Sequence, residues 1–247
     1  MLLELKNIGK TFNPGTVNEK VALNGVSLQM EAGDFATIVG SNGAGKSTLL
    51  RLVAGILLVQ GGKIKFGGKD RKKSGMTVGY MPQNPQTLFT ANSLRKELAG
   101  ERLEEAARLT KLTELLDRHP YDLSGGEQQR AAMAKLLLAD PDIYLLDEPT
   151  KGIDAFFKRK LASVLDKLEQ EGVAIVMVSH DVGTISSVVK SIVCVNRHVH
   201  RHDSNIITEE QLRNYDCPIQ LISHGKVPHT VLASHPHDCC PHTRTEE

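Results

Sequence analysis

The sequence predicts an α/β protein with a mostly parallel sheet, an N-terminal antiparallel β subdomain and a helical insertion. Three observations carry this prediction. Continuous apolar runs at 143–146 and 173–178 are typical of buried parallel strands. Segments with helical spacing alternate with such runs, as they do in parallel sheets covered by helices. The stretch from about 85 to 139 is mainly helical in pattern and therefore reads as an insertion.

The elements are expected in a definite order. Apolar or alternating runs predict strands at 2–12, 21–30 and 35–39, which turn-forming Pro and Gly residues separate. A helix over 46–56 follows a glycine-rich loop, and short strands are expected at 63–66 and 78–81. From 93 to 139 the pattern is helical, with one break at His119 and Pro120. An amphipathic helix over 155–171 lies between the last two strands.

The bulk composition favours a large protein that does not itself cross a membrane. The chain has 247 residues, 40% of them hydrophobic, and its formal net charge is +1, which gives no bulk reason to expect nucleic-acid binding. No apolar run approaches the roughly 18 residues of a spanning helix, and the first residues lack the pattern of a signal peptide. We expect a cytoplasmic protein whose membrane role, if it has one, comes through a partner.

A phosphate-binding loop stands between the strand at 35–39 and the helix that follows. Its pattern, G-x4-G-K-[ST], is matched at every fixed position by residues 40–47. Glycines let backbone N–H groups turn toward phosphates, the lysine supplies a charge, and the serine hydroxyl suits Mg²⁺. A nucleoside triphosphate is therefore expected to contact Gly40, Ser41, Asn42, Gly43, Ala44, Gly45, Lys46, Ser47 and Thr48.

Two further segments carry chemistry of the same kind. Residues 123–130 read L-S-G-G-E-Q-Q-R, in which Ser124, Gly125 and Gly126 open a helix and form an anion-binding end. Taken alone, this segment is also compatible with an ordinary N-capped helix. The strand at 143–146 ends in Asp147 and Glu148, two adjacent acids that are costly to bury without a cation.

These motifs, in this order and spacing, resemble the ABC ATPase family over residues 1 to about 195, and the fold implied is a P-loop NTPase with a RecA-like core. The resemblance implies that Asp147 holds Mg²⁺ together with Ser47, and that Glu148 orients or deprotonates the attacking water. Gln83 matches the family's Q-loop glutamine, which contacts Mg²⁺ and water. His180, 33 residues after Asp147, matches the switch histidine.

Two weaker matches complete the nucleotide site. Residues 152–154 resemble the D-loop, in which Asp154 faces the partner subunit, although Lys151 stands where the family more often has a small residue. Phe12, 28 residues before Gly40, stands where the family stacks an aromatic ring on adenine, and it is also compatible with a plain strand residue. With these, the implied catalytic residues are Glu148, His180, Gln83 and Lys46.

The resemblance also implies partners. In the family each ATP lies between one subunit's phosphate loop and the other's signature, so a second ABC ATPase subunit, identical or related, is expected. The helical insertion presents a groove to a transmembrane permease subunit, which would hold the chain on the inner face of the cell membrane. Only 40 residues separate Gln83 from Leu123, fewer than the family leads us to expect, and the insertion is predicted to be shortened.

Local stretches resemble three groups of uptake ATPases. Residues 10–20 look like importers with lipoprotein receptors, 79–89 and 147–155 like energy-coupling factor ATPases, and 194–200 like zinc and manganese ATPases. The chain therefore reads as a mosaic, natural or constructed, of an importer type. No single stretch assigns the substrate, although a transition-metal ion is the one that these resemblances favour.

The segment 196–247 differs in composition and is treated as a separate tail. All four cysteines, and eight of the ten histidines, lie at or beyond position 194. His198, His200 and His202 would share one face of a strand, and imidazoles and thiols suit Zn²⁺. The spacing matches no structural zinc module, so a solvated tail is the alternative.

Two other functions remain as alternatives. A non-transport ABC ATPase, of the DNA-repair or translation-factor type, would share the nucleotide motifs. Such proteins usually carry coiled-coil insertions or two cassettes, which are not evident here, and the near-neutral charge argues against a nucleic-acid partner. A module that clamps ATP without turnover is disfavoured because Glu148 and His180 are both present.

Overall fold

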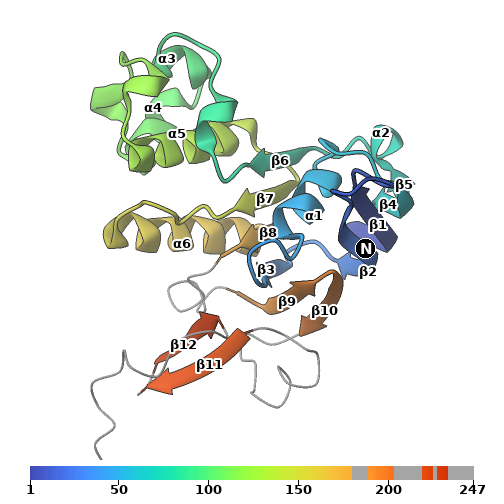
Figure 1. Ribbon diagram of the computed structural model, residues 1–247. Coiled ribbons are helices and arrows are strands. Elements are labelled where there is room, and N and C mark those ends of the chain that lie inside the picture. Colours follow the sequence, from blue (N-terminus) through green and yellow to red (C-terminus); the bar gives the residue numbers. More distant parts are fainter. Residues whose placement is uncertain (180–188, 203–218, 225–226, 233–247) are drawn as a thin grey trace, which may run out of the picture.

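The computed structural model describes residues 1–179, 189–202, 219–224 and 227–232. Figure 1 shows a β-rich part near the N-terminus, a central sheet and a helical part set to one side. In the first half of the chain the elements are β1 Leu3–Phe12, β2 Lys20–Met30, β3 Phe35–Val39, α1 Lys46–Val53, β4 Gly61–Phe66, β5 Lys69–Asp70, α2 Arg71–Ser74, β6 Val78–Met81, α3 Leu94–Glu97 and α4 Leu103–Thr110. They continue with α5 Gly125–Ala139, β7 Ile143–Asp147, α6 Ala155–Gln170, β8 Ala174–Val178, β9 Ser191–Asn196, β10 His198–His202, β11 Ile219–His224 and β12 Val227–Leu232.

The predicted antiparallel β subdomain is present at the N-terminus. Its four strands run in the order β2-β1-β4-β5, and every pairing in it is antiparallel. The pairing of β1 with β2 brings Phe12 opposite Lys20. The side chains of Leu3, Leu5 and Ile8 of β1 are buried, so this sheet covers one side of the molecule's core.

The second sheet carries the nucleotide motifs. Its order is β10-β9-β3-β8-β7-β6, and all pairings are parallel except that of the edge strand β10 with β9. The α/β class with a mostly parallel sheet is therefore confirmed. In parallel sheets the carboxyl ends of neighbouring strands meet at one edge. The loops after β3, β6 and β7 consequently come together there.

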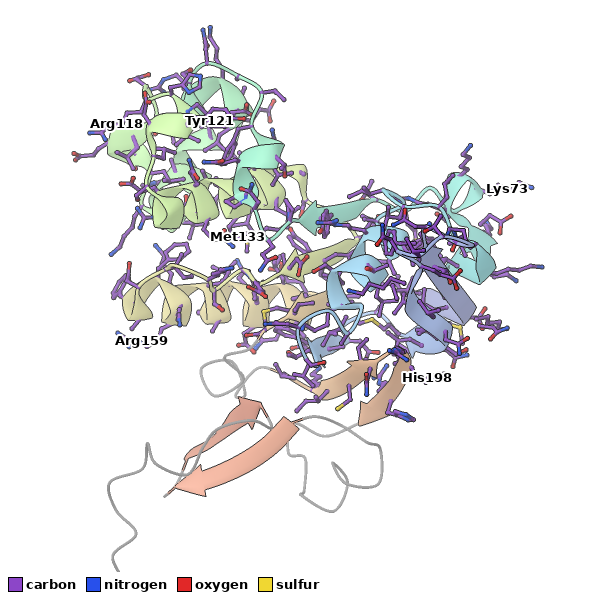
Figure 2. The ribbon with its side chains drawn as sticks, viewed as in Figure 1. Lys73, Arg118, Tyr121, Met133, Arg159 and His198 are labelled. Atoms are coloured by element: carbon purple, nitrogen blue, oxygen red, sulfur yellow. The ribbon has the colours of Figure 1, made fainter. Side chains whose placement is uncertain are left out.

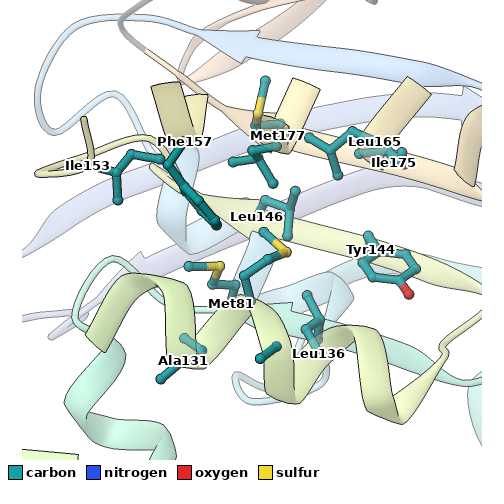
Figure 3. Close-up of a cluster of buried hydrophobic side chains, with 14 of the residues drawn as sticks. Met81, Ala131, Leu136, Tyr144, Leu146, Ile153, Phe157, Leu165, Ile175 and Met177 are labelled. Carbon is teal, nitrogen blue, oxygen red and sulfur yellow. The ribbon is translucent and has the colours of Figure 1, made fainter. Parts of the chain in front are cut away.

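Alternating side chains of β7 enter two separate cores. Ile143 and Leu145 pack with α1 and the N-terminal sheet. Tyr144 and Leu146 face the other way, toward α5 and α6, where they meet Phe157 and Met81 (Figure 3). All four side chains of this strand are fully buried, which explains the uninterrupted apolar run in its sequence.

The helical insertion is less regular than its sequence pattern predicts. Only α5 is long; α3 and α4 are short, and 3₁₀ turns at 113–115 and 120–122 interrupt the rest. The single break expected at His119 and Pro120 is thus one of several. Figure 2 shows Arg118 and Tyr121 on the outer surface of this insertion, whereas Met133 of α5 lies in the space between α5 and α6.

One buried ion pair holds the insertion together. The Glu97 side chain is only 2% exposed and pairs with Lys135 of α5 at 2.5 Å. It also accepts hydrogen bonds from the backbone N–H groups of Thr90 and Ala91, and Lys135 donates to the Leu88 carbonyl at 2.7 Å. Burial acts to raise the pKa of Glu97, but these hydrogen bonds outweigh it and the pKa is lowered.

We expect Glu97→Ala to lower the free energy of unfolding by about 3 kcal/mol, because Lys135 and two amides lose a buried partner. The lowered pKa means that this stabilisation is present at neutral pH and is lost as the pH falls through the carboxyl range. Urea denaturation at pH 7 and pH 4 measures both effects. Glu104→Ala is the control, since its exposed carboxylate lies 3.8 Å from Arg95. Equal losses in the two variants would contradict the role assigned to Glu97.

Several element boundaries differ from the sequence prediction. The helix expected over 46–56 ends at Val53, because Gly55 adopts a left-handed φ of 72° and the chain turns there. The strand β9 and the short elements β5 and α2 were not predicted. Residues 198–202 form β10 and pair with β9, so the six-stranded sheet continues past residue 195. The proposed boundary between cassette and tail stays a prediction.

Candidate functional site

The phosphate loop connects β3 to α1, as predicted. Gly45 is the residue before α1 and has a φ of 103°, which side chains rarely tolerate. A Cβ atom at this position would lie 2.5 Å from the Ala22 carbonyl oxygen of β2. The glycine therefore lets the loop close against the N-terminal sheet, and the start of α1 points its free N–H groups outward.

Lys46 lies inside this loop rather than on the surface. Its ammonium donates hydrogen bonds to the Gly40 carbonyl at 2.8 Å and to the Ser41 carbonyl at 2.9 Å. Burial lowers the pKa of Lys46, and the nearby carboxylates of Glu148 and Asp147 partly offset this effect. The cation is thus fixed in place before any ligand arrives, which reduces the entropy that binding must overcome.

Asp147 stands at the carboxyl end of β7, 1% exposed. It accepts hydrogen bonds from the Ser47 hydroxyl at 3.1 Å and from the Tyr80 hydroxyl at 3.3 Å. Burial is the main cause that raises the pKa of Asp147. A carboxylate, a hydroxyl and the nearby Gln83 amide form the oxygen-donor set that Mg²⁺ prefers, so these residues fit the predicted ion.

The buried charge of Asp147 is expected to lower the stability of the nucleotide-free protein, although the same charge suits Mg²⁺ binding. Because its folded pKa is raised, the ionised carboxylate disfavours the folded state, and stability falls as the pH rises through that pKa. We therefore expect Asp147→Asn to raise the unfolding free energy of the nucleotide-free protein at pH 7. Calorimetry would show a melting temperature above that of the parent. A lower melting temperature than that of the parent would contradict this account.

Glu148 is held by contacts from three different segments. Its backbone is left-handed, with a φ of 56°, a strained conformation for a residue other than glycine. The Gln129 amide of α5 donates to its carbonyl oxygen at 3.1 Å, and Gln83 donates to its carboxylate at 3.0 Å. Lys151 forms an ion pair with the same carboxylate at 3.6 Å. The side chain is therefore aimed at the cavity described next.

An open cavity of about 240 Å³ lies over the phosphate loop. Glu148 and Gln83 enter it from the carboxyl edge of the sheet, and Phe12 borders it from β1. The ammonium of Lys10 lies 5.5 Å from the centre of the Phe12 ring. The cavity is lined by Phe12, Lys20, Ala22, Asn42, Gly43, Gly45, Lys46, Ser47, Thr48, Gln83 and Glu148.

The signature segment does not line this cavity. Ser124 begins α5 in a capping box: its hydroxyl accepts from the Glu127 amide, and the Glu127 carboxylate accepts from the Ser124 amide at 2.8 Å. A Cβ at Gly126 would lie 2.7 Å from the Gly152 carbonyl, so the signature helix packs closely on the D-loop segment. Asp154 caps α6 by accepting from the Phe157 amide at 2.8 Å.

The structure thus brings together most, but not all, of the residues predicted from sequence. Phe12 and the phosphate-loop residues meet Gln83, Asp147 and Glu148, whereas the signature residues and Asp154 lie apart from the cavity. His180 lies outside the described residues. Sequence reasoning missed Lys20, Tyr80 and Gln129. Gln129 stands within the quoted signature, four residues after Gly125, and its helical spacing is the signal that could have found it.

The described residues of the tail form no metal centre. His200 lies opposite Cys194 in the pairing of β10 with β9, and His198 lies opposite Asn196. Among the described residues, no group of three or more His, Cys, Asp or Glu side chains is placed to hold a metal ion. Most of the other candidate ligands, including Cys239, Cys240 and His242, lie outside the described residues.

Comparisons with known proteins place the chain in a family. A family model described as ABC transporter matches residues 23–151. An ABC transporter ATP-binding protein of Bacillus thuringiensis subsp. konkukian is 40% identical over 67% of this chain, and the chain spans only 33% of that relative's length. A protein of Thermotoga maritima, named as a metal transport system ATP-binding protein, is 32% identical over 92% of this chain and 97% of its own.

A solved structure shows the same fold. The ATP-binding cassette MJ0796, crystallised as a dimer in a post-hydrolysis state with ADP and Pi, is 26% identical to this chain, with a TM-score of 0.73. The similarity covers 82% of this chain and 98% of that one. The predicted P-loop cassette fold and the resemblance to metal-uptake ATPases are confirmed. This chain belongs to the ABC transporter family of ATP-binding cassettes.

Proposed function

We propose that this chain is the ATP-binding and ATP-hydrolysing subunit of an ABC transporter and couples closure of a cassette dimer to substrate movement through a separate membrane subunit. The observation that carries the proposal is that Lys46, Gln83 and Glu148 line one cavity, while Asp147 accepts a hydrogen bond from Ser47 at the edge of that cavity. These residues come from three segments far apart in the sequence. A cation, a buried carboxylate and an aimed carboxylate together suit phosphoanhydride hydrolysis.

Each of these side chains has a separate task in the proposed mechanism. The amides of the phosphate loop and the Lys46 ammonium bind the phosphates, and Phe12 stacks on the base. Ser47, Asp147 and Gln83 would hold Mg²⁺, which supplies charge neutralisation on the phosphate oxygens. Glu148 orients the attacking water and accepts its proton, and the left-handed backbone keeps its carboxylate directed at the cavity. His180 completes the set by resemblance.

A second cassette completes the site. Ser124, Gly125, Gly126 and Asp154 lie outside the cavity of their own chain, so they are available to the nucleotide of a partner. The dimeric state of MJ0796 supports this arrangement. ATP that contacts both subunits stabilises the closed dimer, and its hydrolysis removes those contacts. The partner cassette is either a second copy or a related subunit.

The proposed membrane partner is a transmembrane permease. The chain docks on it through the helical insertion, at the inner face of the cell membrane. Within the described residues, no helix combines the length and apolar character that crossing a bilayer requires. The name of the Thermotoga relative supports a metal ion as the transported substrate. The proposed direction, uptake, follows from the local sequence resemblance to importers. The alternative, a non-transport ABC ATPase, predicts co-purification with nucleic acid rather than with a membrane protein.

The tail carries a secondary proposal. Its histidines and cysteines would bind Zn²⁺ and regulate the ATPase. Zinc titration of the purified protein tests this proposal, and we expect stoichiometric binding together with a changed ATPase rate. If neither effect is observed, the proposal fails and the tail is a solvated segment.

Magnesium-dependent ATP hydrolysis by the purified chain is the first test of the proposed function. We expect turnover that ceases when EDTA removes the metal, with phosphate release as the readout. Affinity purification from cells follows, and a permease should accompany the chain. An absence of ATP binding under all conditions would overturn the proposal, and recovery of nucleic acid alone would favour the non-transport alternative.

A further inference from the structure

We propose that Lys20 makes a second cationic contact with the phosphate chain of the bound nucleotide, in addition to that of Lys46. The inference rests on the proposed nucleotide function, since it adds a residue to the same cavity. Lys20 is the last residue of the stretch 10–20 that resembles importer ATPases, but it belongs to none of the nucleotide-binding motifs described above. It was found only because the structure brings the first residue of β2 to the edge of the cavity.

The strand pairing places Lys20 beside the base-binding end of the site. In the antiparallel register of β1 and β2, Phe12 and Lys20 are directly opposite each other. Side chains of such a pair project on the same face of the sheet, with Cβ atoms about 5 Å apart. Both residues line the same cavity. The Lys20 side chain therefore starts beside the residue proposed to stack on adenine.

The lysine also reaches the phosphate loop from outside. A Cβ atom built on Gly43 would lie 3.4 Å from the Lys20 ammonium nitrogen. Gly43 is in the middle of the loop, whose backbone amides are expected to surround the phosphates. Lys20 consequently spans from the base side of the cavity to the loop, along the path that a nucleotide's phosphate chain would follow.

The two lysines of the cavity are in different states. Lys46 is buried, and its ammonium already donates to the carbonyls of Gly40 and Ser41. Lys20 is exposed and, within the part of the chain that the structure describes, forms no ion pair. The neighbouring Glu19 carboxylate is engaged by the Gly15 amide at 2.7 Å. An exposed cation of this kind is free to turn toward an arriving polyanion.

A series of charge variants tests the inference. Lys20→Met keeps the apolar stem but removes the charge, Lys20→Glu reverses it, and Lys20→Arg retains it. We expect Lys20→Met to weaken ATP and ADP binding about fivefold to tenfold, a modest effect because the site is exposed. Lys20→Glu should weaken it further, and Lys20→Arg should stay within about twofold of the parent. Displacement of a fluorescent nucleotide measures each affinity.

The controls separate a phosphate contact from a general effect of charge or folding. Lys72→Met and Lys72→Glu make the same charge changes on α2, outside the cavity lining, and should leave affinity unchanged. Adenosine, which lacks phosphates, should bind the Lys20 variants as it binds the parent. Raising the salt concentration should weaken ATP binding more steeply in the parent than in Lys20→Met.

The inference is overturned if Lys20→Met and Lys20→Glu bind ATP as tightly as the Lys72 variants do. It is also overturned if adenosine binding falls in parallel with ATP binding, because Lys20 would then support the base side through Phe12. If the parent binds ATP but the affinities of the Lys20 variants do not change with the charge at position 20, only the inference about Lys20 fails and the proposed function stands. A parent that binds no nucleotide overturns both.

Discussion

Replacing Glu148 with Gln is expected to lower the ATP hydrolysis rate by roughly 10²- to 10⁴-fold, the range typical of losing a general base. The amide keeps the shape of the side chain and one oxygen for the hydrogen bond from Gln83. It cannot accept a proton from water, and the ion pair with Lys151 is lost. Nucleotide affinity should stay within about threefold of the parent, because the phosphate loop is untouched.

Single-turnover phosphate release measures this effect independently of product dissociation. Glu171→Gln is the matched control: its carboxylate pairs with Lys167 at 3.7 Å on the exposed side of α6 and should not affect the rate. Hydrolysis by Glu148→Gln at a rate close to that of the parent would remove Glu148 from the proposed mechanism. Gln83 would then be the next group to test.

Replacing Lys46 with Ala is expected to weaken Mg-ATP binding by about 100-fold. The variant loses a buried charge-assisted contact with the phosphates, a class of interaction stronger than a neutral hydrogen bond. It also removes the Lys46 hydrogen bonds to the carbonyls of Gly40 and Ser41, and the Ser41 carbonyl keeps only the Ala44 amide as a donor, so the loop itself should become less ordered.

Isothermal calorimetry measures the affinity, and Lys72→Ala, an exposed lysine on α2, controls for the change in net charge. Because Lys46 is 7% exposed, Lys46→Arg should not restore binding; the larger side chain has no room in the loop. An affinity for Mg-ATP within about threefold of the parent would show that the loop binds phosphates without this cation.

The sequence predicted the parallel strands β3, β6, β7 and β8 because each has a local signature, whereas the parallel strand β9 was missed. Residues 143–146 are apolar on both faces, as a strand buried between two layers must be, and the structure places them there. The helical insertion was harder to predict. Its residues have helical spacing, but Lys111 adopts a left-handed conformation that ends α4 at Thr110, and the sequence pattern did not show this. The end of α5 at Ala139 does agree with the prediction.

The site shows a similar division between local and long-range information. The phosphate loop could be read directly, since its chemistry depends on contiguous residues. Tyr80 could not, because its contact with Asp147 joins residues 67 positions apart on neighbouring strands. Lys20 was missed for the same reason: only the register of β1 with β2 brings it beside Phe12. Such contacts depend on how the segments pack together.

The helical insertion links the nucleotide site to the proposed permease surface. Gln83 touches Glu148, and a few residues later the chain passes Leu88, which receives the Lys135 hydrogen bond from the signature helix. Movement of Gln83 would therefore act on α5 through the Glu97 and Lys135 pair. This connection gives the stability variant Glu97→Ala a second use, since it should also weaken the coupling between hydrolysis and transport.

The central claim is that each nucleotide lies between the phosphate loop of one cassette and the signature of another. Its most direct test is the mass, by light scattering, of Glu148→Gln with and without an added Gly125→Asp substitution. A Cβ at Gly125 meets nothing within 4 Å, so the new carboxylate should fit its own subunit and repel only a partner's phosphates. We predict that ATP doubles the mass of Glu148→Gln and leaves the double variant monomeric, although both bind ATP. A Glu148→Gln protein that stays monomeric with ATP bound, or a double variant that dimerises equally well, would contradict the account.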